Sequence, residues 1–230
     1  MNKGLVYYTD NRPDPRILEV VQKQIKKCVD WPIVSVSLKP IDFGHNIVLD
    51  LQRGYLTMFK QILAGIEAST ADILYFVEHD VLYNPSHFVF EPPKKDVFYY
   101  NENRWMVHAQ TGQALFYHAM STSHLCAYRE LLLEHYKKRV KRVEKEGFTY
   151  SLGFEPGNHP YPRGVDFYGR EAWWSEYPNI DLRGNWNLTA TRWTKDGFRN
   201  KKNLYAWTET EEVPYWGKTK DNMEQLLGDL

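Results

Sequence analysis

The chain has 230 residues, with 29 Lys and Arg against 29 Asp and Glu, so its net charge is close to zero. Hydrophobic residues make up 43%, which is ordinary globular usage and excludes intrinsic disorder, collagen and coiled coil. The balanced charge argues against broad electrostatic capture of nucleic acid, whose affinity depends on neutralising phosphates. The longest apolar run, residues 73–77, is far shorter than the about 20 residues of a membrane-spanning helix, so no membrane partner is expected.

The chain begins almost directly in a strand-like run, which leaves no room for a leader peptide and predicts a cytoplasmic location, bacterial or in a phage-infected host. Cys28 and Cys126 are too few for a disulfide framework or a four-thiolate zinc site, and we expect both in the core. Aromatic residues reach 15%, with 8 Trp and 16 Tyr. This density indicates either a thick aromatic core or stacking on flat ligands such as sugars and bases.

The first half alternates strand-like and helix-like segments. Residues 4–8 predict a strand that ends in a polar loop. Asp14 and Pro15 have the pattern of a helix cap followed by proline in the first turn, and apolar residues at helical spacing continue to about residue 30. Residues 32–38 predict a second strand, and residues 53–69 carry an apolar stripe typical of a second helix.

The continuous apolar run at residues 73–77 predicts a third strand, buried on both faces, that ends in Glu78, His79 and Asp80. The order strand, helix, strand, helix, strand indicates an α/β fold with a Rossmann-like, mixed but mainly parallel sheet flanked by helices. Ligands of such sheets bind beyond the carboxyl ends of the strands. Residues 9–11 and 78–80 both occupy that position.

The second half is less regular, and we expect one domain over residues 1–230 with an irregular C-terminal half. The segments expected there are short strands at 97–100, 105–109 and 113–118, a helix at about 123–145, site-wrapping loops at 153–193 and a short acidic helix from residue 221.

Glu78 and Asp80 are the most informative pair of residues. Two carboxylates at the end of a buried strand can hold a divalent cation, and that cation can hold a diphosphate. A departing nucleoside diphosphate develops negative charge, which such a cation stabilises. The alternative is that both residues are solvated loop acids.

The chain resembles the nucleotide-sugar glycosyltransferases of the glycosyltransferase-A fold, close to the family-2-like members, in three ordered blocks. These read LVYYTDN near the start, RGYLTMFKQILAGIEASTADILYFVEHDVLY in the middle and EAWWSEYPNIDLRGNWNLTATRW late in the chain. The resemblance implies a nucleotide-sugar-binding half at residues 1–100 and an acceptor-binding half at residues 101–230.

The resemblance also implies site residues. Those implied are Thr9, Asp10 and Asn11 at the base and ribose, Arg53 and Gln61 facing the nucleotide, Glu78 and Asp80 as ligands of Mn²⁺ or Mg²⁺, and Glu171 as the general base of an inverting reaction. The chain departs from the family pattern at two points. Glu78 replaces the first Asp of the metal motif, and Gly184 follows Arg183 where relatives often have a histidine.

The residues around Glu171 favour an acceptor site, because a base must reach the acceptor hydroxyl while Trp173 and Trp174 form a sugar-stacking wall that excludes water. The alternative is that Glu171 pairs with Arg170 on the surface and that the tryptophans are core. The competing acids are Asp166 and Glu176. Arg183 either forms a structural pair with Asp181 or binds the diphosphate.

Other chemistries lack their motifs. The sequence has no His-Glu-x-x-His zinc pattern, no Gly-rich phosphate loop and no Gly-x-Ser-x-Gly elbow. The basic residues at 137–145 are either a solvated helix face or part of a phosphate-binding rim suited to DNA. The other residues of that rim are Arg192, Lys195, Arg199, Lys201 and Lys202.

The sequence therefore predicts a metal-dependent, hexosyltransferase-like enzyme that moves a sugar from a nucleoside diphosphate sugar to an acceptor hydroxyl. The acceptor stays open among a soluble glycan, a protein and a modified nucleic acid such as a modified DNA base. The alternatives are a non-catalytic carbohydrate or nucleotide-sugar binding module and a nucleic-acid-binding protein.

Overall fold

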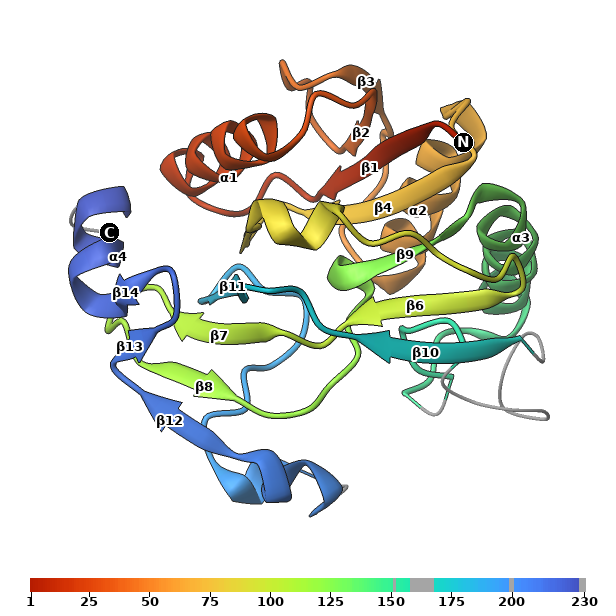
Figure 1. Cartoon of the computed structure of the whole chain (residues 1–230). Coiled ribbons are helices and arrows are strands. Elements are labelled where there is room, and N and C mark those ends of the chain that lie inside the picture. Colours follow the sequence, from red (N-terminus) through yellow and green to blue (C-terminus); the bar gives the residue numbers. More distant parts are fainter. Residues whose placement is uncertain (151, 158–167, 199–200, 228–230) are drawn as a thin grey trace.

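The computed structural model describes residues 1–150, 152–157, 168–198 and 201–227, which form two main sheets with covering helices (Figure 1). The larger, seven-stranded sheet has the order β10-β6-β9-β4-β1-β2-β3. Its strands are β1 (Lys3–Thr9), β2 (Ile33–Ser37), β3 (His45–Val48), β4 (Ile73–Glu78), β6 (Val97–Asn101), β9 (Leu125–Tyr128) and β10 (Gly169–Trp173).

The pairing in this sheet is mainly parallel. β1 pairs in parallel with β2 and β4, β2 with β3, and β6 with β10, while β9 runs antiparallel between β4 and β6. The expected mixed, mainly parallel α/β architecture is confirmed. The second sheet has the order β12-β8-β7-β11-β5. Its strands are β5 (Val81–Leu82), β7 (Arg104–His108), β8 (Ala114–Phe116), β11 (Asn179–Arg183) and β12 (Thr208–Thr210), and β13 (Glu212–Val213) and β14 (Gly217–Lys218) form a separate hairpin.

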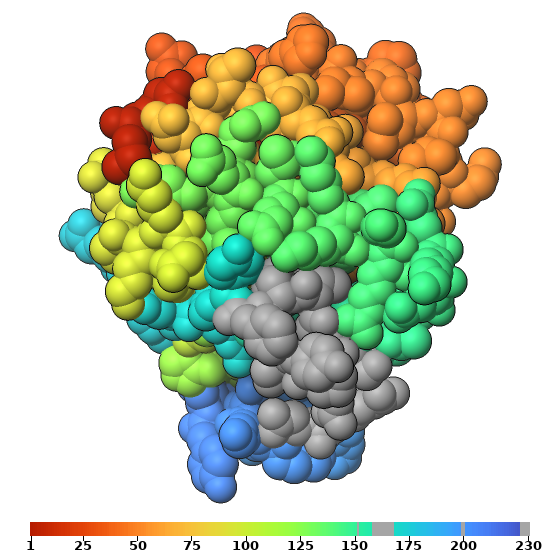
Figure 2. Space-filling view, turned by 90° about the vertical axis from the view of Figure 1, so that its right-hand side faces the viewer, coloured from red at the N-terminus to blue at the C-terminus, as the bar shows by residue number. Residues whose placement is uncertain are grey.

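Helices cover both faces of the larger sheet, with α1 (Pro15–Cys28) on one face and α2 (Tyr55–Ala68) and α3 (Arg129–Glu146) on the other. α4 (Thr219–Leu227) lies against α1 and β14. Short 3₁₀ helices are found at Pro85–Phe88, Thr122–His124, Lys195–Gly197 and Lys201–Ala206. α2 and α3 lie side by side, linked by ion pairs from Lys60 to Glu144 and from Lys137 to Glu67, and α3 is the green helix at the right of Figure 2. Among the described residues, none of the helices combines the length and the apolar character that a membrane crossing requires.

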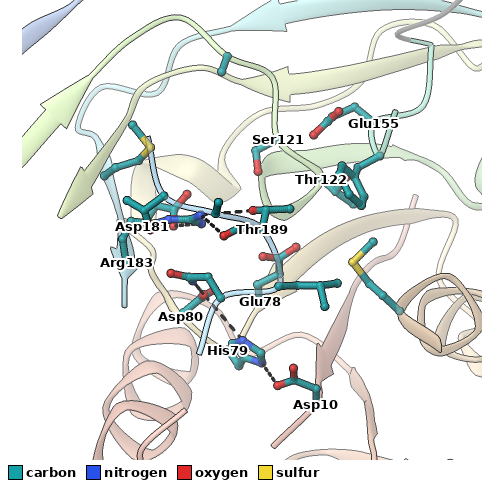
Figure 3. Close-up of a pocket in the computed structure, with 18 of the residues that line it drawn as sticks. Asp10, Glu78, His79, Asp80, Ser121, Thr122, Glu155, Asp181, Arg183 and Thr189 are labelled. Carbon is teal, nitrogen blue, oxygen red and sulfur yellow. Dashed lines mark hydrogen bonds and ion pairs between the residues drawn. The ribbon is translucent and has the colours of Figure 1, made fainter. Parts of the chain in front are cut away.

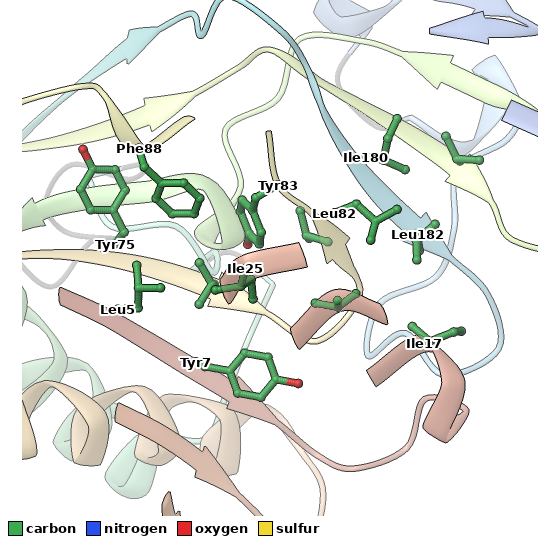
Figure 4. Close-up of a cluster of buried hydrophobic side chains, with 14 of the residues drawn as sticks. Leu5, Tyr7, Ile17, Ile25, Tyr75, Leu82, Tyr83, Phe88, Ile180 and Leu182 are labelled. Carbon is green, nitrogen blue, oxygen red and sulfur yellow. The ribbon is translucent and has the colours of Figure 1, made fainter. Parts of the chain in front are cut away.

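Alternating side chains of β1 divide the core between the two helical layers. Leu5 and Tyr7 are fully buried and join the cluster that includes Ile17 and Ile25 of α1 (Figure 4). The intervening Val6 packs with α2 on the other face. This alternation is what a strand buried on both faces requires.

Close packing of α2 on β1 depends on a glycine. A Cβ at Gly65 would lie 2.5 Å from a methyl group of Val6, so only a residue without a side chain lets the helix approach this strand. The predicted cap of α1 is confirmed, since the Asp14 carboxylate accepts a hydrogen bond from the Arg16 amide at 2.9 Å.

Two expectations about the second half were wrong. The helix expected at 123–145 begins only at Arg129, because Leu125–Tyr128 is β9. An apolar run of this length fits a strand or a buried helical turn equally well, and pairing with β4 and β6 decides for the strand. The segment expected to be loops, residues 153–193, contributes β10 and β11, one to each sheet.

Two histidines are buried between the sheets. The rings of His87 and His124 lie 5.8 Å apart, and the Nε2 atom of each has no hydrogen-bond partner among the described residues. Burial lowers the pKa of His87 to about 3, and burial together with Arg104 and His87 lowers the pKa of His124 well below its ordinary value. Both rings are therefore neutral in the folded protein.

We expect these histidines to weaken the fold in mild acid. The unfolded chain binds their protons below about pH 6.5 and the folded chain does not, so His87 alone lowers the free energy of unfolding by about 2 kcal/mol at pH 5. His87→Met should be less stable than wild type at pH 7.5 and should lose less on going to pH 5. Thermal melts at both pH values check this, with the exposed His45→Gln as control. Equal pH slopes for His87→Met and wild type would contradict it.

Candidate functional site

A cavity of about 750 Å³ lies at the carboxyl ends of β1 and β4. Its walls come from these strand ends, the start of α2, strands β7 and β11, and the segments 117–122, 153–155 and 187–192. Figure 3 shows Glu78, His79 and Asp80 in the middle of this cavity, with Asp10 to one side and Glu155 to the other. The structure thus brings together several residues that the sequence singled out, namely Thr9, Asp10, Arg53, Gln61, Glu78, Asp80 and Arg183.

Asp80 is a buried carboxylate, and only one of its two side-chain oxygens has a hydrogen-bond partner among the described residues. Its Oδ2 atom accepts a hydrogen bond from Asn187 Nδ2 at 2.6 Å, and its backbone oxygen accepts one from the Leu182 amide at 2.7 Å. The Oδ1 atom is buried and has no hydrogen-bond partner among the described residues. Burial raises the pKa of Asp80 despite the neighbouring His79, whose Nε2 lies 3.7 Å from Oδ2. Because buried polar atoms are rarely left unpaired, this oxygen is a position for a further cation or donor.

Glu78 shares the low-polarity environment of Asp80. Its carboxylate accepts a hydrogen bond from the Tyr8 hydroxyl, and burial followed by the charge of Asp80 raises its pKa to about 8. Two acids so placed hold one negative charge easily and two only when a positive charge comes between them. A divalent cation would provide that charge. Among the described residues, no three or more His, Cys, Asp or Glu side chains form a ready-made metal cluster.

Asp10 and Arg53 form the rim of the cavity beside β1. Arg53 Nε lies 2.5 Å from Asp10 Oδ2, and Arg53 Nη2 donates to the Trp186 carbonyl at 2.9 Å. His79 Nδ1 lies 2.8 Å from Thr9 Oγ1 and 3.9 Å from Asp10 Oδ1. The loop after β1 is thus connected to the end of β4 through His79 and, through Arg53, to Trp186, the residue before the 187–192 segment. Hydroxyl, carboxylate and guanidinium groups meet there at the cavity surface.

Gln61 and Asn11 support the loop after β1 through hydrogen bonds to backbone groups. Gln61 is buried and its side chain donates to the carbonyls of Thr9 at 2.7 Å and Val36 at 3.3 Å. Asn11 has a left-handed backbone, with φ of 58°, and its side-chain oxygen accepts from the amides of residues 38 and 39 at 2.8 and 2.9 Å. Asn11 does not line the cavity. The hydrogen bonds of both side chains therefore hold the backbone of the loop in its shape.

A buried charge group forms the wall opposite β1. Arg104 Nη1 lies 2.9 Å from Asp181 Oδ2, and Arg183 Nη1 lies 3.4 Å from Asp181 Oδ1. Arg183 Nη2 also reaches the Thr189 carbonyl at 3.4 Å, and its Nε has no hydrogen-bond partner among the described residues. Arg183 therefore forms the pair with Asp181 and also lines the cavity, and its contact with a diphosphate stays a prediction. The sequence analysis missed Arg104, which has no motif and gains its role from the pairing of β7 with β11.

The structure does not bring Glu171 to the cavity. Glu171 lies on β10, a strand at the edge of the larger sheet, and pairs with Lys94 at 2.6 Å, with 44% of its side chain exposed. Trp173 stacks on Phe90 at 4.4 Å between ring centroids, within the core. Trp174 is 52% exposed and contacts Phe116 and His118, also outside the cavity.

Of the two competing acids, Glu176 is exposed and does not line the cavity. Asp166 lies outside the described residues, as does Arg199 of the expected basic rim.

The basic end of α3 is an ion-paired helix face. Lys138 pairs with Glu134 at 2.6 Å and Arg142 with Glu146 at 3.1 Å, both one helical turn apart. Arg139 is buried. Such pairs compensate the positive charge that DNA phosphates would need, so the structure does not support a modified DNA acceptor.

Comparisons with known proteins give structural neighbours alone. No protein-family model matches the chain, and no curated protein matches it. The chain is similar to a glycosyltransferase involved in glycosylation of the major capsid of PBCV-1, with 9% identity over 76% of this chain and 82% of that chain and a TM-score of 0.47. It is similar to an active-site mutant of LgtC, with 12% identity over 84% and 92% of the two chains and a TM-score of 0.43. A Drosophila β1,4-galactosyltransferase 7 mutant, solved with manganese, UDP-Gal and xylobiose, has 12% identity over 65% of this chain and 63% of its own and a TM-score of 0.39.

Proposed function

We propose that the protein transfers a sugar from a nucleoside diphosphate sugar to an acceptor hydroxyl. The observation that carries this proposal is the cavity at the carboxyl ends of β1 and β4, in which the buried Asp80 has an oxygen without a donor beside Glu78. Acids at the strand ends of a mainly parallel sheet suit a cation and the phosphates that it binds. Residues from all three sequence blocks that resemble glycosyltransferases line this cavity.

Asp80 and Glu78 are the residues that would hold the cation, Mn²⁺ or Mg²⁺. Mg²⁺ sites of this kind use one or two protein carboxylates and take their other ligands from water and substrate phosphates, so they do not require three or more clustered His, Cys, Asp or Glu side chains, and none are so clustered among the described residues. When bound, the cation would stabilise the negative charge of the departing nucleoside diphosphate. Asn187 and the Leu182 amide hold Asp80 in place for this role.

The two halves of the chain would divide the substrates between them. In residues 1–100, Thr9, Asp10 and Arg53 would bind the nucleoside part through hydroxyl, carboxylate and guanidinium groups. Arg183, whose Nε atom is unpaired among the described residues, would contact the diphosphate. Residues 101–230 would supply the acceptor side of the cavity.

We expect nucleoside diphosphates to stabilise the fold only together with a divalent cation. A ligand present at 100 times its dissociation constant adds about 2.7 kcal/mol of stability, or a rise in melting temperature of about 5–10 °C for a domain of this size. The measurement is thermal unfolding against UDP, GDP, ADP and dTDP and their hexose conjugates, with Mn²⁺, with Mg²⁺ and with EDTA.

A second assay separates an enzyme from a binding module. It tests whether the protein also cleaves the hexose conjugate that shifts its melting temperature. Release of nucleoside diphosphate supports the enzyme, and binding without release supports the module. No shift with any nucleotide in the presence of either cation would refute the proposed function. A nucleic-acid-binding protein is not favoured, since Lys138 and Arg142 of α3 are paired with acids.

A further inference from the structure

One buried hydroxyl of the cavity wall has no hydrogen-bond partner. Thr122 lines the cavity and is 4% exposed, and its Oγ1 atom is buried and unpartnered among the described residues. The two other buried threonines that the structure describes on this wall use their hydroxyls within the protein. Thr9 Oγ1 accepts from the Asn11 amide at 3.0 Å, and Thr57 Oγ1 donates to the Gln52 carbonyl. Because buried polar atoms are rarely left unpaired, the Thr122 hydroxyl is a position for a polar group of a ligand.

Thr122 is held in a fixed place relative to the proposed cation ligands. It begins the short 3₁₀ helix Thr122–His124, which leads into β9, the neighbour of β4 in the larger sheet. The Glu78 amide donates to the Tyr83 hydroxyl at 3.1 Å, and that hydroxyl donates to the Ser123 carbonyl at 2.7 Å. The end of β4 and the residue after Thr122 are therefore joined through one fully buried phenol. A group supported in this way can recognise a ligand precisely.

Thr122 lies on the other side of the strand-end acids from the nucleoside rim. Figure 3 shows Ser121 and Thr122 beyond Glu78 and Asp80 as seen from Asp10. In a nucleoside diphosphate sugar, the diphosphate separates the nucleoside from the sugar. With the nucleoside at Asp10 and the phosphates at the cation, the sugar extends toward Thr122.

The polar groups beside Thr122 on its own helix are neutral. The hydroxyls of Ser121 and Ser123 lie 2.8 Å apart, and Ser123 Oγ lies 2.8 Å from Nδ1 of His124. Burial lowers the pKa of His124 well below its ordinary value, so its ring carries no charge. A threonine hydroxyl donates one hydrogen bond and accepts others, as a sugar hydroxyl does. The chemistry of this part of the wall therefore suits an uncharged hydroxyl.

We propose that Thr122 binds a hydroxyl of the transferred sugar and makes the protein selective for a donor hexose that has a free hydroxyl at the contacted position, an inference that rests on the proposed function. A donor without this hydroxyl loses the hydrogen bond and leaves Oγ1 buried and unpaired. Both effects act against such a donor. Thr122 determines specificity through binding and takes no part in making or breaking bonds.

A cycle of hydroxyl deletions tests this contact. The change on the protein is Thr122→Val, which keeps the branched shape of the side chain and removes the hydroxyl. The changes on the substrate are the single-deoxy analogues of the hexose conjugate that the wild type turns over, one for each hydroxyl of the sugar. The measured quantity is kcat/KM for nucleoside diphosphate release with water as the acceptor, so that the donor is the only sugar present.

We expect the two deletions to be coupled at one position of the sugar. Thr122→Val should lose about tenfold in kcat/KM with the parent conjugate, the effect of one neutral hydrogen bond, and lose nothing further with the analogue that lacks the contacted hydroxyl. The other analogues should be penalised equally in both proteins. Thr122→Ser keeps the hydroxyl and should stay within about threefold of wild type. The exposed Thr70→Val is the matched control and should behave as wild type with every donor.

The melting temperature separates a binding role from a structural one. Because Oγ1 has no partner within the described protein, Thr122→Val should unfold at the wild-type temperature or above it. A clear fall in melting temperature would show that the hydroxyl stabilises the fold and would overturn the inference. An equal loss of kcat/KM with the parent and every analogue, or a loss that appears only when methyl glucoside is added as acceptor, would overturn it too.

Failure of the inference and failure of the proposed function give different results. If a conjugate is turned over and Thr122→Val shows the same preference among the analogues as wild type, only the role of Thr122 is lost. If the wild type neither binds nor turns over any nucleotide sugar, both are overturned. Binding without turnover would overturn the proposed function, and the same cycle read from the donor-dependent melting shift would then decide whether Thr122 contacts the sugar.

Discussion

Asp80→Asn is expected to lower sugar-donor turnover by about 10³-fold, because the neutral amide holds a divalent cation poorly and the charge on the departing diphosphate then lacks its partner. The substitution is nearly isosteric, and the amide oxygen can still accept the hydrogen bond that Asn187 donates to Asp80 at 2.6 Å. The measurement is nucleoside diphosphate release over a range of Mn²⁺ concentrations, alongside the melting shift that the nucleotide produces with metal.

The same substitution should leave the fold as stable as wild type or more stable. Burial raises the pKa of Asp80, so at pH 7 its charge opposes folding, and that penalty disappears with the amide. A gain in stability on substitution is expected for a functional residue whose presence makes the fold less stable. The matched control is Asp30→Asn at an exposed position, which should change neither property. Full turnover in Asp80→Asn, or a large loss of stability, would contradict the role given to this residue.

The first half of the fold could be predicted because its signals are local. The cap at Asp14 and the apolar run at residues 73–77 each act over a few residues, and parallel β-strands have to end at the same edge of their sheet. The position of Asp80 beside the first loop follows from that geometry alone. These predictions need no information about which residues far apart in the sequence are in contact.

The opposite side of the cavity could not be predicted in the same way, since its residues meet only through long-range packing. Glu155 has no motif of its own, and its position depends on Arg139 and Tyr100, which come from α3 and β6. Glu171 stands in a block that resembles glycosyltransferases, but β10 pairs with β6 at the sheet edge and carries it away from the cavity. Strand pairing of this kind leaves no periodic trace in a single sequence.

Arg104→Met is expected to be the most destabilising of the substitutions considered. Arg104 and Asp181 are each 7% exposed at the side chain and lie 2.9 Å apart, so removal of the guanidinium leaves a buried carboxylate with Arg183 as its remaining ion-pair partner at 3.4 Å. Breaking one side of such a pair costs about 3 kcal/mol or more. For a domain of this length that corresponds to a fall in melting temperature of about 6–12 °C.

The physical reason can be tested apart from the loss of contacts. If the uncompensated charge of Asp181 causes the loss, the double variant Arg104→Met with Asp181→Asn should be more stable than Arg104→Met alone, because the nearly isosteric amide carries no charge and its oxygen can still accept a hydrogen bond from Arg183. Lys23→Met removes an exposed pair with Glu19 at 2.5 Å and should leave the melting temperature close to that of wild type. A double variant that is less stable than Arg104→Met would show that packing around Asp181, and not its charge, holds β7 against β11.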